Sequence, residues 1–350
     1  MSRKLLVTGN MGYIGPVLLK HLNSSAHCEY EVIGYDTGYF AHCITTLEGL
    51  PERFLHAQYF GDLREFDSSL LAGVDTVVHL AAISNDPIGN AFAEVTRAIN
   101  IDASVAIARM AKAAGVRRFV FSSSCSVYGA GSNQACDENA TLNPLTPYAI
   151  SKIAMEESLA RICDENFSAV CLRFATACGM SDRLRLDLVL NDFVACTLAK
   201  GKIEILSDGT PWRPLIHVDD MARAIEWGIL AESEEPFLAV NCGSDAWNYQ
   251  IKDLAFAVAA EIPETEVSIN NDAMPDNRSY KVDFTRFTEL AEGFTPIVTL
   301  KEAIDGLRSG LERIGFDDRN FRESNLMRLQ MLRRHVDRGS LSDDLRWFTP

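Results

Sequence analysis

Short apolar runs alternate with segments of helical periodicity through the first half of the chain. The runs are rich in β-branched and aromatic residues, and they predict strands over 4–8, 31–36, 57–60, 75–80, 117–122 and 169–173. Helical spacing of apolar residues predicts helices over 14–22, 91–114 and 148–163. Several strands are almost continuously apolar, which is typical of a parallel sheet buried on both faces. The pattern predicts an α/β fold with a Rossmann-type doubly wound parallel sheet.

After residue 173 the alternation becomes irregular, with a helix expected over 188–200, a strand over 203–206 and a strand-to-helix step over 215–230. We therefore expect a Rossmann domain over 1–175, with segments near 202–242 returning to it, and a smaller α/β domain over 176–315. The remaining residues, 316–350, carry leucines at helical spacing and predict a docked helical tail.

Composition and charge narrow the class of protein. The longest apolar runs are far shorter than the roughly 20 residues that span a bilayer, so we expect no membrane span. The N-terminus lacks the pattern of a signal peptide, which favours a cytoplasmic protein. Nine cysteines without a Cys-x-x-Cys pair indicate reduced thiols and no zinc site. A net charge of −15 argues against a nucleic-acid partner.

A glycine-rich turn follows the first predicted strand and opens a helix, with the sequence Thr-Gly-Asn-Met-Gly-Tyr-Ile-Gly. Gly9 permits the tight turn, Gly12 lets the backbone approach a pyrophosphate, and Gly15 allows close helix packing. The helix N-terminus then faces the phosphate charge. Asp36 ends the second strand, where a carboxylate can bind both ribose hydroxyls and repel a 2′-phosphate. This arrangement predicts a dinucleotide site that favours NAD over NADP.

A tyrosine and a lysine stand four residues apart at the start of a predicted helix, where i and i+4 side chains share one face. A cation near a phenol lowers its pKa, so Lys152 would help Tyr148 to act as a base near neutral pH. Upstream, a cluster of serines over 122–126 ends a buried strand, at the sheet edge where sites usually form. A Tyr-x-x-x-Lys pair alone also arises by chance on exposed helices.

Taken together, these motifs resemble the extended short-chain dehydrogenase/reductase superfamily, and within it the NAD-dependent nucleotide-sugar epimerase/dehydratase family, over about residues 1–315. The motifs are the glycine turn, Asp36, Gly-Asp-Leu at 61–63, His-Leu-Ala-Ala at 79–82, Asn100, three serines at 122–124 and Tyr-x-x-x-Lys at 148–152. The resemblance implies a nucleotide-sugar-binding domain over 176–315 and a homodimer joined by the helices 91–114 and 148–163. It also implies that Lys152 holds the nicotinamide ribose and that Ser124 hydrogen-bonds the reacting oxygen.

The same resemblance assigns residues to both ligands. Around NAD it places Gly9, Gly12, Tyr13, Ile14, Gly15, Asp36, Asp62, Leu63, Leu80, Ala81, Ala82, Asn100, Ser122, Tyr148 and Lys152. The segment 208–220 is similar to a signature in which an arginine grips the substrate diphosphate, which indicates Arg213 and, as second choice, Arg278. A planar guanidinium binds phosphate oxygens bidentately, which suits this role. The full set expected around the nucleotide-sugar is Ser84, Ser124, Ser126, Thr176, Asn191, Arg213 and Arg278.

Departures from the family pattern restrict the chemistry. Cys125 and Ser126 stand where 4,6-dehydratases carry the Asp-Glu pair that protonates a leaving hydroxyl. In 3,5-epimerases a catalytic cysteine lies two residues after the catalytic serine, whereas Cys125 directly follows Ser124. The usual Arg-Tyr-Phe-Asn reads Arg-Phe-Ala-Thr at 173–176. We expect an epimerase that acts through a transient 4-keto sugar, with Tyr148 as base and hydride transfer to NAD.

Two alternatives stay open. A 4-dehydrogenase or 4-ketoreductase with net redox is the first, because the run 185–193 resembles nucleotide-heptose 4-dehydrogenases. A non-catalytic dinucleotide-sensing module is the second, although such relatives typically lose the tyrosine or the lysine. The sequence distinguishes neither the nucleotide nor the sugar.

Overall fold

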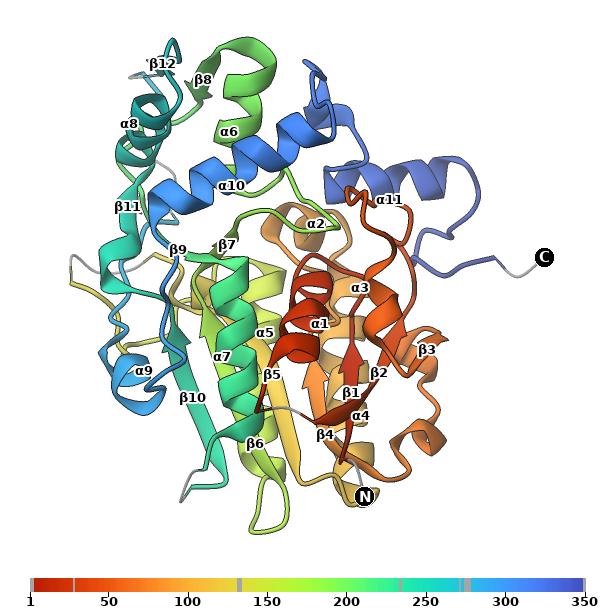
Figure 1. The fold of residues 1–350 in the computed structure, drawn as a ribbon. Helices are drawn as coiled ribbons and strands as arrows, with labels where there is room; N and C mark the ends of the chain where they lie inside the picture. The colour runs from red at the N-terminus through yellow and green to blue at the C-terminus, as the bar shows by residue number, and fades with distance from the viewer. Residues whose placement is uncertain are drawn as a thin grey trace.

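A seven-stranded sheet forms the centre of the molecule (Figure 1). The computed structural model describes residues 3–27, 29–130, 134–232, 235–270, 272–273 and 278–348. Every neighbouring pair in the sheet is parallel. Its strands, in spatial order, are β10 (Phe237–Cys242), β6 (Ser168–Phe174), β5 (Arg118–Ser124), β4 (Val74–His79), β1 (Arg3–Thr8), β2 (Tyr30–Asp36) and β3 (Ala57–Phe60). The predicted Rossmann-type sheet is confirmed.

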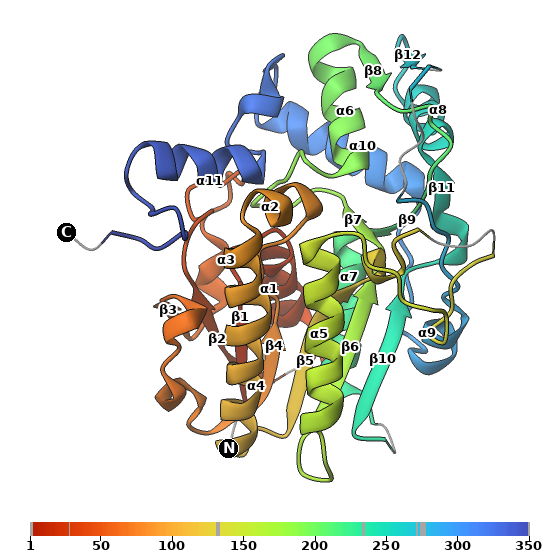
Figure 2. The same ribbon diagram turned by 180° about the vertical axis from the view of Figure 1, so that it is seen from behind.

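Helices cover both faces of this sheet. On one face lie α1 (Gly15–Ser24) and α7 (Val218–Leu230), and on the other α4 (Ser104–Ala113) and α5 (Pro147–Ile162) (Figures 1 and 2). Because successive strand side chains point to opposite faces, Phe119 and Val120 of β5 are buried in two different cores. His21 of α1 bonds Glu226 of α7 at 2.6 Å and links the two helices of the first face.

The single helix expected over 91–114 is broken in the structure. It consists of α2 (Asp86–Ala91), α3 (Ala93–Arg97), a π-helical turn (Ala98–Ala103) and α4. Ser104 Oγ donates to the carbonyl of Ile99 at 2.9 Å, five residues back, which suits the wider turn. π-turns inside helices are frequent at functional sites, and this one presents Asn100 to Ile83 and Ser151. Periodicity alone does not reveal such a turn.

The second part of the chain builds smaller sheets above the carboxyl edge of the large one. β7 (Thr176–Cys178), β9 (Trp212–His217) and β11 (Asn248–Gln250) form one, and β8 (Lys202–Ile205) pairs with β12 (Glu266–Ile269). The accompanying helices are α6 (Val189–Lys200), α8 (Ile251–Glu261), α9 (Thr285–Leu290) and α10 (Leu300–Arg313). Of the region 202–242, α7 and β10 lie with the large sheet, whereas β8 and β9 belong to the smaller ones.

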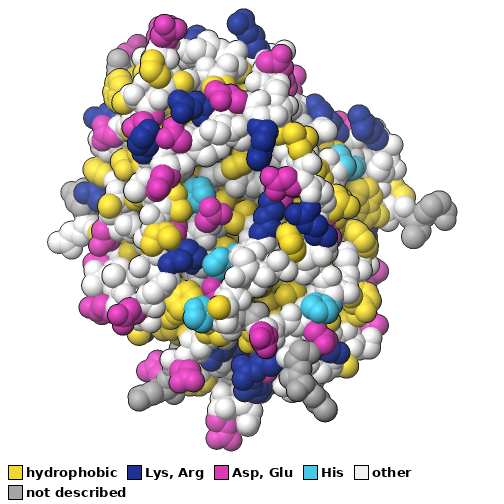
Figure 3. Space-filling model, viewed as in Figure 1, with side chains coloured by type: hydrophobic (Ala, Val, Ile, Leu, Met, Phe, Trp, Pro, Cys, Tyr) yellow, Lys and Arg dark blue, Asp and Glu magenta, His cyan; other side chains and the backbone are white. Residues whose placement is uncertain are grey.

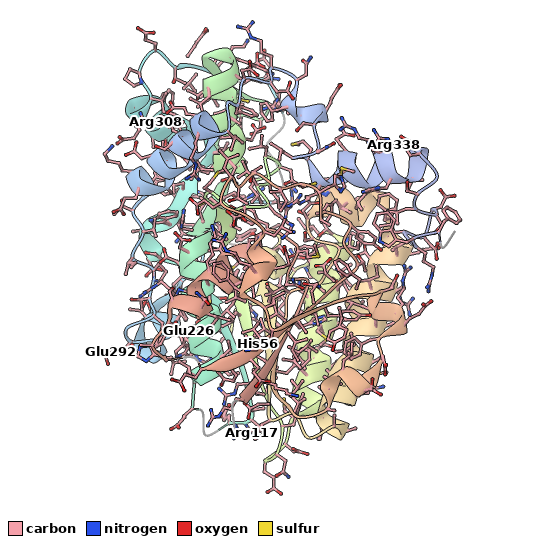
Figure 4. The ribbon with its side chains drawn as sticks, turned by 45° about the vertical axis from the view of Figure 1, so that its right-hand side comes forward. His56, Arg117, Glu226, Glu292, Arg308 and Arg338 are labelled. Carbon is pink, nitrogen blue, oxygen red and sulfur yellow. The ribbon has the colours of Figure 1, made fainter. Side chains whose placement is uncertain are left out.

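The tail crosses back over the first half of the chain. Its helix α11 (Arg328–Asp337) lies beside α2, and α10 and α11 run across the top of the molecule, where Figure 4 labels Arg308 and Arg338. Leu332 is fully buried, and Leu329 and Val336 pack against the same core. The stripe read from the sequence is therefore the packed face of this helix.

Short 3₁₀ turns complete the chain at η1 (Pro51–Phe54), η2 (Leu63–Glu65), η3 (Ser68–Leu71), η5 (Cys125–Tyr128), η6 (Asp245–Trp247) and η7 (Phe321–Glu323). Within the described residues, no helix has both the length and the apolar character needed to cross a membrane. The same residues contain no group of three or more His, Cys, Asp or Glu side chains placed to hold a metal ion. The eight described cysteines are free. Acidic and basic side chains are interspersed over the face shown in Figure 3.

Candidate active site

A cavity of about 670 Å³ lies where the strands of the large sheet end and the smaller sheets begin. Ligands of doubly wound folds bind at this edge, because the loops after parallel strands meet there. The cavity collects most of the residues that the sequence predicts for NAD and substrate. Those that line it are Gly9, Gly12, Tyr13, Ile14, Asp36, Asp62, Leu63, Leu80, Ala81, Ala82, Ser84, Ser122, Ser124, Ser126, Tyr148, Lys152, Thr176, Arg213 and Arg278.

The glycine turn has the shape that a phosphate-binding loop requires. Gly9 has a positive φ of 76°, and a Cβ there would lie 2.5 Å from the backbone nitrogen of Ala81. A Cβ at Gly15 would lie 2.0 Å from the carbonyl oxygen of Asn10, so α1 packs directly on the turn. Gly12 lines the cavity with its bare backbone. Gly9 and Gly15 thus allow the turn to pack closely on its neighbours, and Gly12 leaves its backbone open to an approaching pyrophosphate.

Two carboxylates expected to bind the cofactor line the cavity. Asp36 accepts hydrogen bonds from the backbone nitrogens of Met11 at 2.9 Å and Gly38 at 2.7 Å, and burial raises its pKa. Asp62 accepts from the backbone nitrogen of Arg64 at 2.8 Å and forms an ion pair with its guanidinium. A 2′-phosphate beside Asp36 would meet a like charge, so the geometry fits NAD better than NADP.

The proposed catalytic side chains come from adjacent elements. Ser124 is the last residue of β5, and Tyr148 lies in the first turn of α5, which Thr146 caps through the backbone nitrogen of Ala149 at 3.2 Å. The Ser124 hydroxyl lies close enough to the Tyr148 phenol to lower its pKa. Lys152, one turn further on, donates to the carbonyl of Ser122 at 2.6 Å and lies 5.3 Å from the centre of the Tyr148 ring. The three residues therefore meet at one place.

Burial dominates the electrostatics of this group. It raises the pKa of Tyr148 to about 12, against the lowering effects of the Ser124 hydroxyl and the Arg185 charge. Burial also lowers the pKa of Lys152 to about 7. The sequence led us to expect the cation to lower the phenol pKa, but the cost of burying a charge is larger in the protein alone. At neutral pH the phenol therefore keeps its proton and the amine is about half protonated, so the phenolate–ammonium form is a minor state of the protein alone.

Three predicted residues lie behind the cavity wall and not in it. Asn100 binds the backbone of Ile83 through both amide atoms, at 2.8 and 3.0 Å, and bonds Ser151. Asn191 accepts from the backbone nitrogen of Gly179 at 2.9 Å and donates to the carbonyl of Arg185 at 2.8 Å. Gly15 is covered by Asn10, as described above. In this structure the two asparagines hold lining loops in position.

The two arginines assigned to the substrate diphosphate both line the cavity. Arg213, on β9, donates to the carbonyl of Trp212 at 2.8 Å, and its guanidinium lies 5.8 Å from the centre of the Tyr280 ring. Arg278 forms an ion pair with Asp86 at 2.8 Å and is partly exposed. Asp86 also accepts from Thr146, the cap of α5, so Arg278 is connected to the helix that carries Tyr148.

Other charged lining residues lie outside the set expected around NAD and the nucleotide-sugar, although the sequence left the segment 183–187 open as either further substrate contacts or a solvated loop. Arg185 forms an ion pair with Asp187 at 2.9 Å and donates to Ser84 at 3.2 Å. Arg322 and Arg328 reach the cavity from the tail. The sequence gives little reason to choose Arg322 and Arg328, because arginines are frequent throughout 316–350 and this stretch lies far along the chain from the sequence motifs.

Comparison with known proteins assigns the family. The model of the NAD dependent epimerase/dehydratase family matches residues 5–243, which is more than half of the chain. The chain belongs to this family. The matched region holds the glycine turn, Asp36, Ser124 and the Tyr148/Lys152 pair, so the family assignment rests on the same motifs that form the cavity.

Individual relatives agree with this assignment. An uncharacterized UDP-glucose epimerase, YtcB of Bacillus subtilis, is 32% identical over 63% of this chain and 71% of its own length. A UDP-glucose 4-epimerase of Streptomyces lividans is 28% identical over 70% of this chain and 77% of its own. Among solved structures, MoeE5 in complex with UDP-glucuronic acid and NAD is similar with a TM-score of 0.74 and 27% identity, covering 89% of this chain and 99% of that one.

Proposed function

We propose that the protein is an NAD-dependent nucleotide-sugar epimerase that works through a transient 4-keto sugar. The observation that carries this proposal is the meeting of Ser124, Tyr148 and Lys152 in a cavity that the glycine turn and Asp36 also line. The lining includes both the residues expected around NAD and those expected around the nucleotide-sugar, and Arg213 and Arg278 supply cations for a substrate diphosphate.

The residues after Ser124 argue against a dehydratase. The Cys125 thiol is 1% exposed, donates to the carbonyl of Arg173 at 3.0 Å, and has a pKa that burial raises well above its usual value. Ser126 carries only a hydroxyl. Neither residue can provide the acid that a leaving hydroxyl requires, whereas oxidation and reduction at a single carbon need no such acid.

The chain's own residues then divide the work. Tyr148 accepts the proton of the sugar hydroxyl, Ser124 donates a hydrogen bond to the same oxygen, and Lys152 stabilises the phenolate form of Tyr148. Bound NAD supplies the hydride acceptor for the carbinol carbon and the donor for its return. In an epimerase the keto sugar turns within the cavity before the proton and hydride come back to the other face.

The substrate is expected to be a nucleotide-sugar, and the relatives that act on UDP-glucose support uridine diphosphate sugars as the first choice. A 4-dehydrogenase or 4-ketoreductase uses the same residues and differs only in the release of the keto sugar. The presence of all three catalytic side chains argues against a dinucleotide sensor. A homodimer through α4 and α5, a cytoplasmic location and the division at residues 175 and 315 stay predictions.

The test is a panel of nucleotide-sugars incubated with protein and NAD, with NADH absorbance and product identity followed together. An epimerase gives the 4-epimer without NADH accumulating. Stoichiometric NADH with a keto product identifies a dehydrogenase instead. If no sugar in the panel changes while NAD binds normally, the epimerase proposal is wrong.

A further inference from the structure

Arg328, the first residue of α11, brings a buried positive charge to the cavity from the far end of the chain. Its side chain is 1% exposed, and its guanidinium lies 4.4 Å from the centre of the Phe40 ring. It donates to the carbonyl of Arg183 at 2.8 Å through Nη2. Its other terminal nitrogen, Nη1, is buried and has no hydrogen-bond partner among the residues that the structure describes.

The charges around Arg328 leave it without a counterion. Arg183 forms an ion pair with Glu52 at 2.7 Å, and Arg185 forms one with Asp187 at 2.9 Å. No carboxylate of the described ranges lies within ion-pair distance of Arg328. Burial lowers the pKa of Arg328 to about 10, and Arg183 and Arg185 act in the same direction. A buried, unpaired guanidinium is costly unless an anion joins it.

The position of Arg328 indicates which part of the cavity the anion would occupy. Phe40 belongs to the loop after Asp36. On the other side, Ser181 precedes Arg183 and donates to the carbonyl of Tyr13 in the glycine turn at 2.7 Å. Arg328 therefore lies between the loop that follows Asp36 and the segment that packs on the phosphate-binding turn.

Backbone contacts of the tail hold this arrangement together. Trp347 donates to the carbonyl of Thr37 at 2.7 Å, and His335 bonds the carbonyl of Tyr39 at 3.2 Å. Arg64, the ion-pair partner of Asp62, donates to the carbonyl of Asp344 at 2.7 Å. The tail thus fastens the two loops that carry Asp36 and Asp62.

We propose that Arg328 binds a diphosphate, that of NAD, and that the C-terminal tail is a clasp which retains the cofactor. The unpartnered Nη1 of this guanidinium can donate to a phosphate oxygen, and the neighbouring Arg183 and Arg185 are already paired with carboxylates. The diphosphate of the nucleotide-sugar has the same chemistry, but Arg213 and Arg278 line the cavity for that ligand. This inference rests on the NAD binding that the proposed function requires.

The test compares R328M with wild type and with R333M, which removes an exposed arginine of the same helix. NADH binding is measured by fluorescence titration and by the rate of release on dilution. We expect R328M to bind NADH about 10- to 100-fold more weakly, the size of a lost hydrogen-bonded charge contact. R333M should bind as wild type does. Unchanged NADH affinity in R328M would overturn the proposal.

Thermal unfolding adds a readout that a structural role would not produce. Without NADH, R328M should melt at the wild-type temperature or above it, because a buried uncompensated charge is gone. With saturating NADH, the rise in melting temperature should be smaller than for wild type. A lower melting temperature in both conditions, with an equal rise on adding NADH, would show that Arg328 only packs the tail. If R328M does not fold, R328K should fold and bind NADH several-fold more weakly.

A second titration separates the two sources of diphosphate. Uridine diphosphate is added to NADH-saturated wild type and R328M, and its affinity should be the same for both. If R328M lost affinity for uridine diphosphate but not for NADH, Arg328 would bind the substrate diphosphate, and its assignment to the cofactor would be refuted. None of these measurements needs turnover. If the protein proved inactive but its NADH affinity still depended on Arg328, the epimerase function would be refuted and the proposed role of Arg328 in NAD binding would be supported.

Discussion

The two walls of the cavity are built in different ways. The catalytic wall joins the end of β5 to the first turns of α5, within 31 positions of the chain from Ser122 to Lys152. The tail-side wall joins the loops near Asp36 and Asp62 to residues such as Arg328 and Trp347, roughly 300 positions away. The first wall is held by regular secondary structure and the second by loop contacts. We therefore expect changes in the first to affect chemistry and changes in the second to affect cofactor retention.

The largest effect should come from Tyr148→Phe. The substitution keeps the ring beside Lys152 but removes the oxygen that accepts the sugar proton, so turnover should fall by about 100- to 10,000-fold. NADH affinity should stay near that of wild type, because the phenol oxygen does not hold the fold. Steady-state rates and NADH titrations measure the two effects. Tyr59→Phe, at a partly exposed tyrosine outside the cavity lining, is the matched control.

A Tyr148→Phe protein that turned over at the wild-type rate would remove Tyr148 from the mechanism. A variant that lost both catalytic rate and NADH affinity would contradict the expected division between the two walls, because it would show that the catalytic wall also retains the cofactor.

The next effect is the dependence of rate on pH. Below the pKa of Lys152, about 7, both Lys152 and Tyr148 are protonated, and the phenol cannot accept a proton. Above it, the pair has lost one proton: most of the protein then holds phenol with neutral amine, and a small constant fraction holds phenolate with ammonium, which is the reactive form. The rate should therefore rise about tenfold per pH unit below 7 and level off above it. A rate that fell as pH rose from 6 to 8 would contradict this assignment.

The contrast between the walls also explains which features the sequence could predict. Tyr148 and Lys152 are found because helical spacing places i and i+4 on one face, and Gly9 is found because its turn needs a positive φ. Arg328 could not be found, because its role depends on where a distant helix docks. The π-turn at 98–103 was missed for a related reason: it is set by contacts of Asn100 with Ile83 and Ser151, not by periodicity.

The smallest effect should come from Trp347→Phe on the tail-side wall. Trp347 lies outside the cavity lining and is 41% exposed, and its indole nitrogen donates to the carbonyl of Thr37. Phenylalanine keeps an aromatic ring against His335 but loses that donor, which costs about 0.5–1.5 kcal/mol for a neutral hydrogen bond, with the low end expected for a partly exposed one.

If the tail retains NAD, this loss should speed NADH release about two- to threefold while kcat stays the same, because no hydrogen bond or ion pair joins Ser124, Tyr148 or Lys152 to the described part of the tail. Stopped-flow dilution measures the release and steady-state assays measure kcat. Phe348→Leu, at an exposed neighbour, should change neither quantity. If kcat fell while release stayed slow, the loops held by the tail would act on the chemical step, and the separation of the two walls would fail.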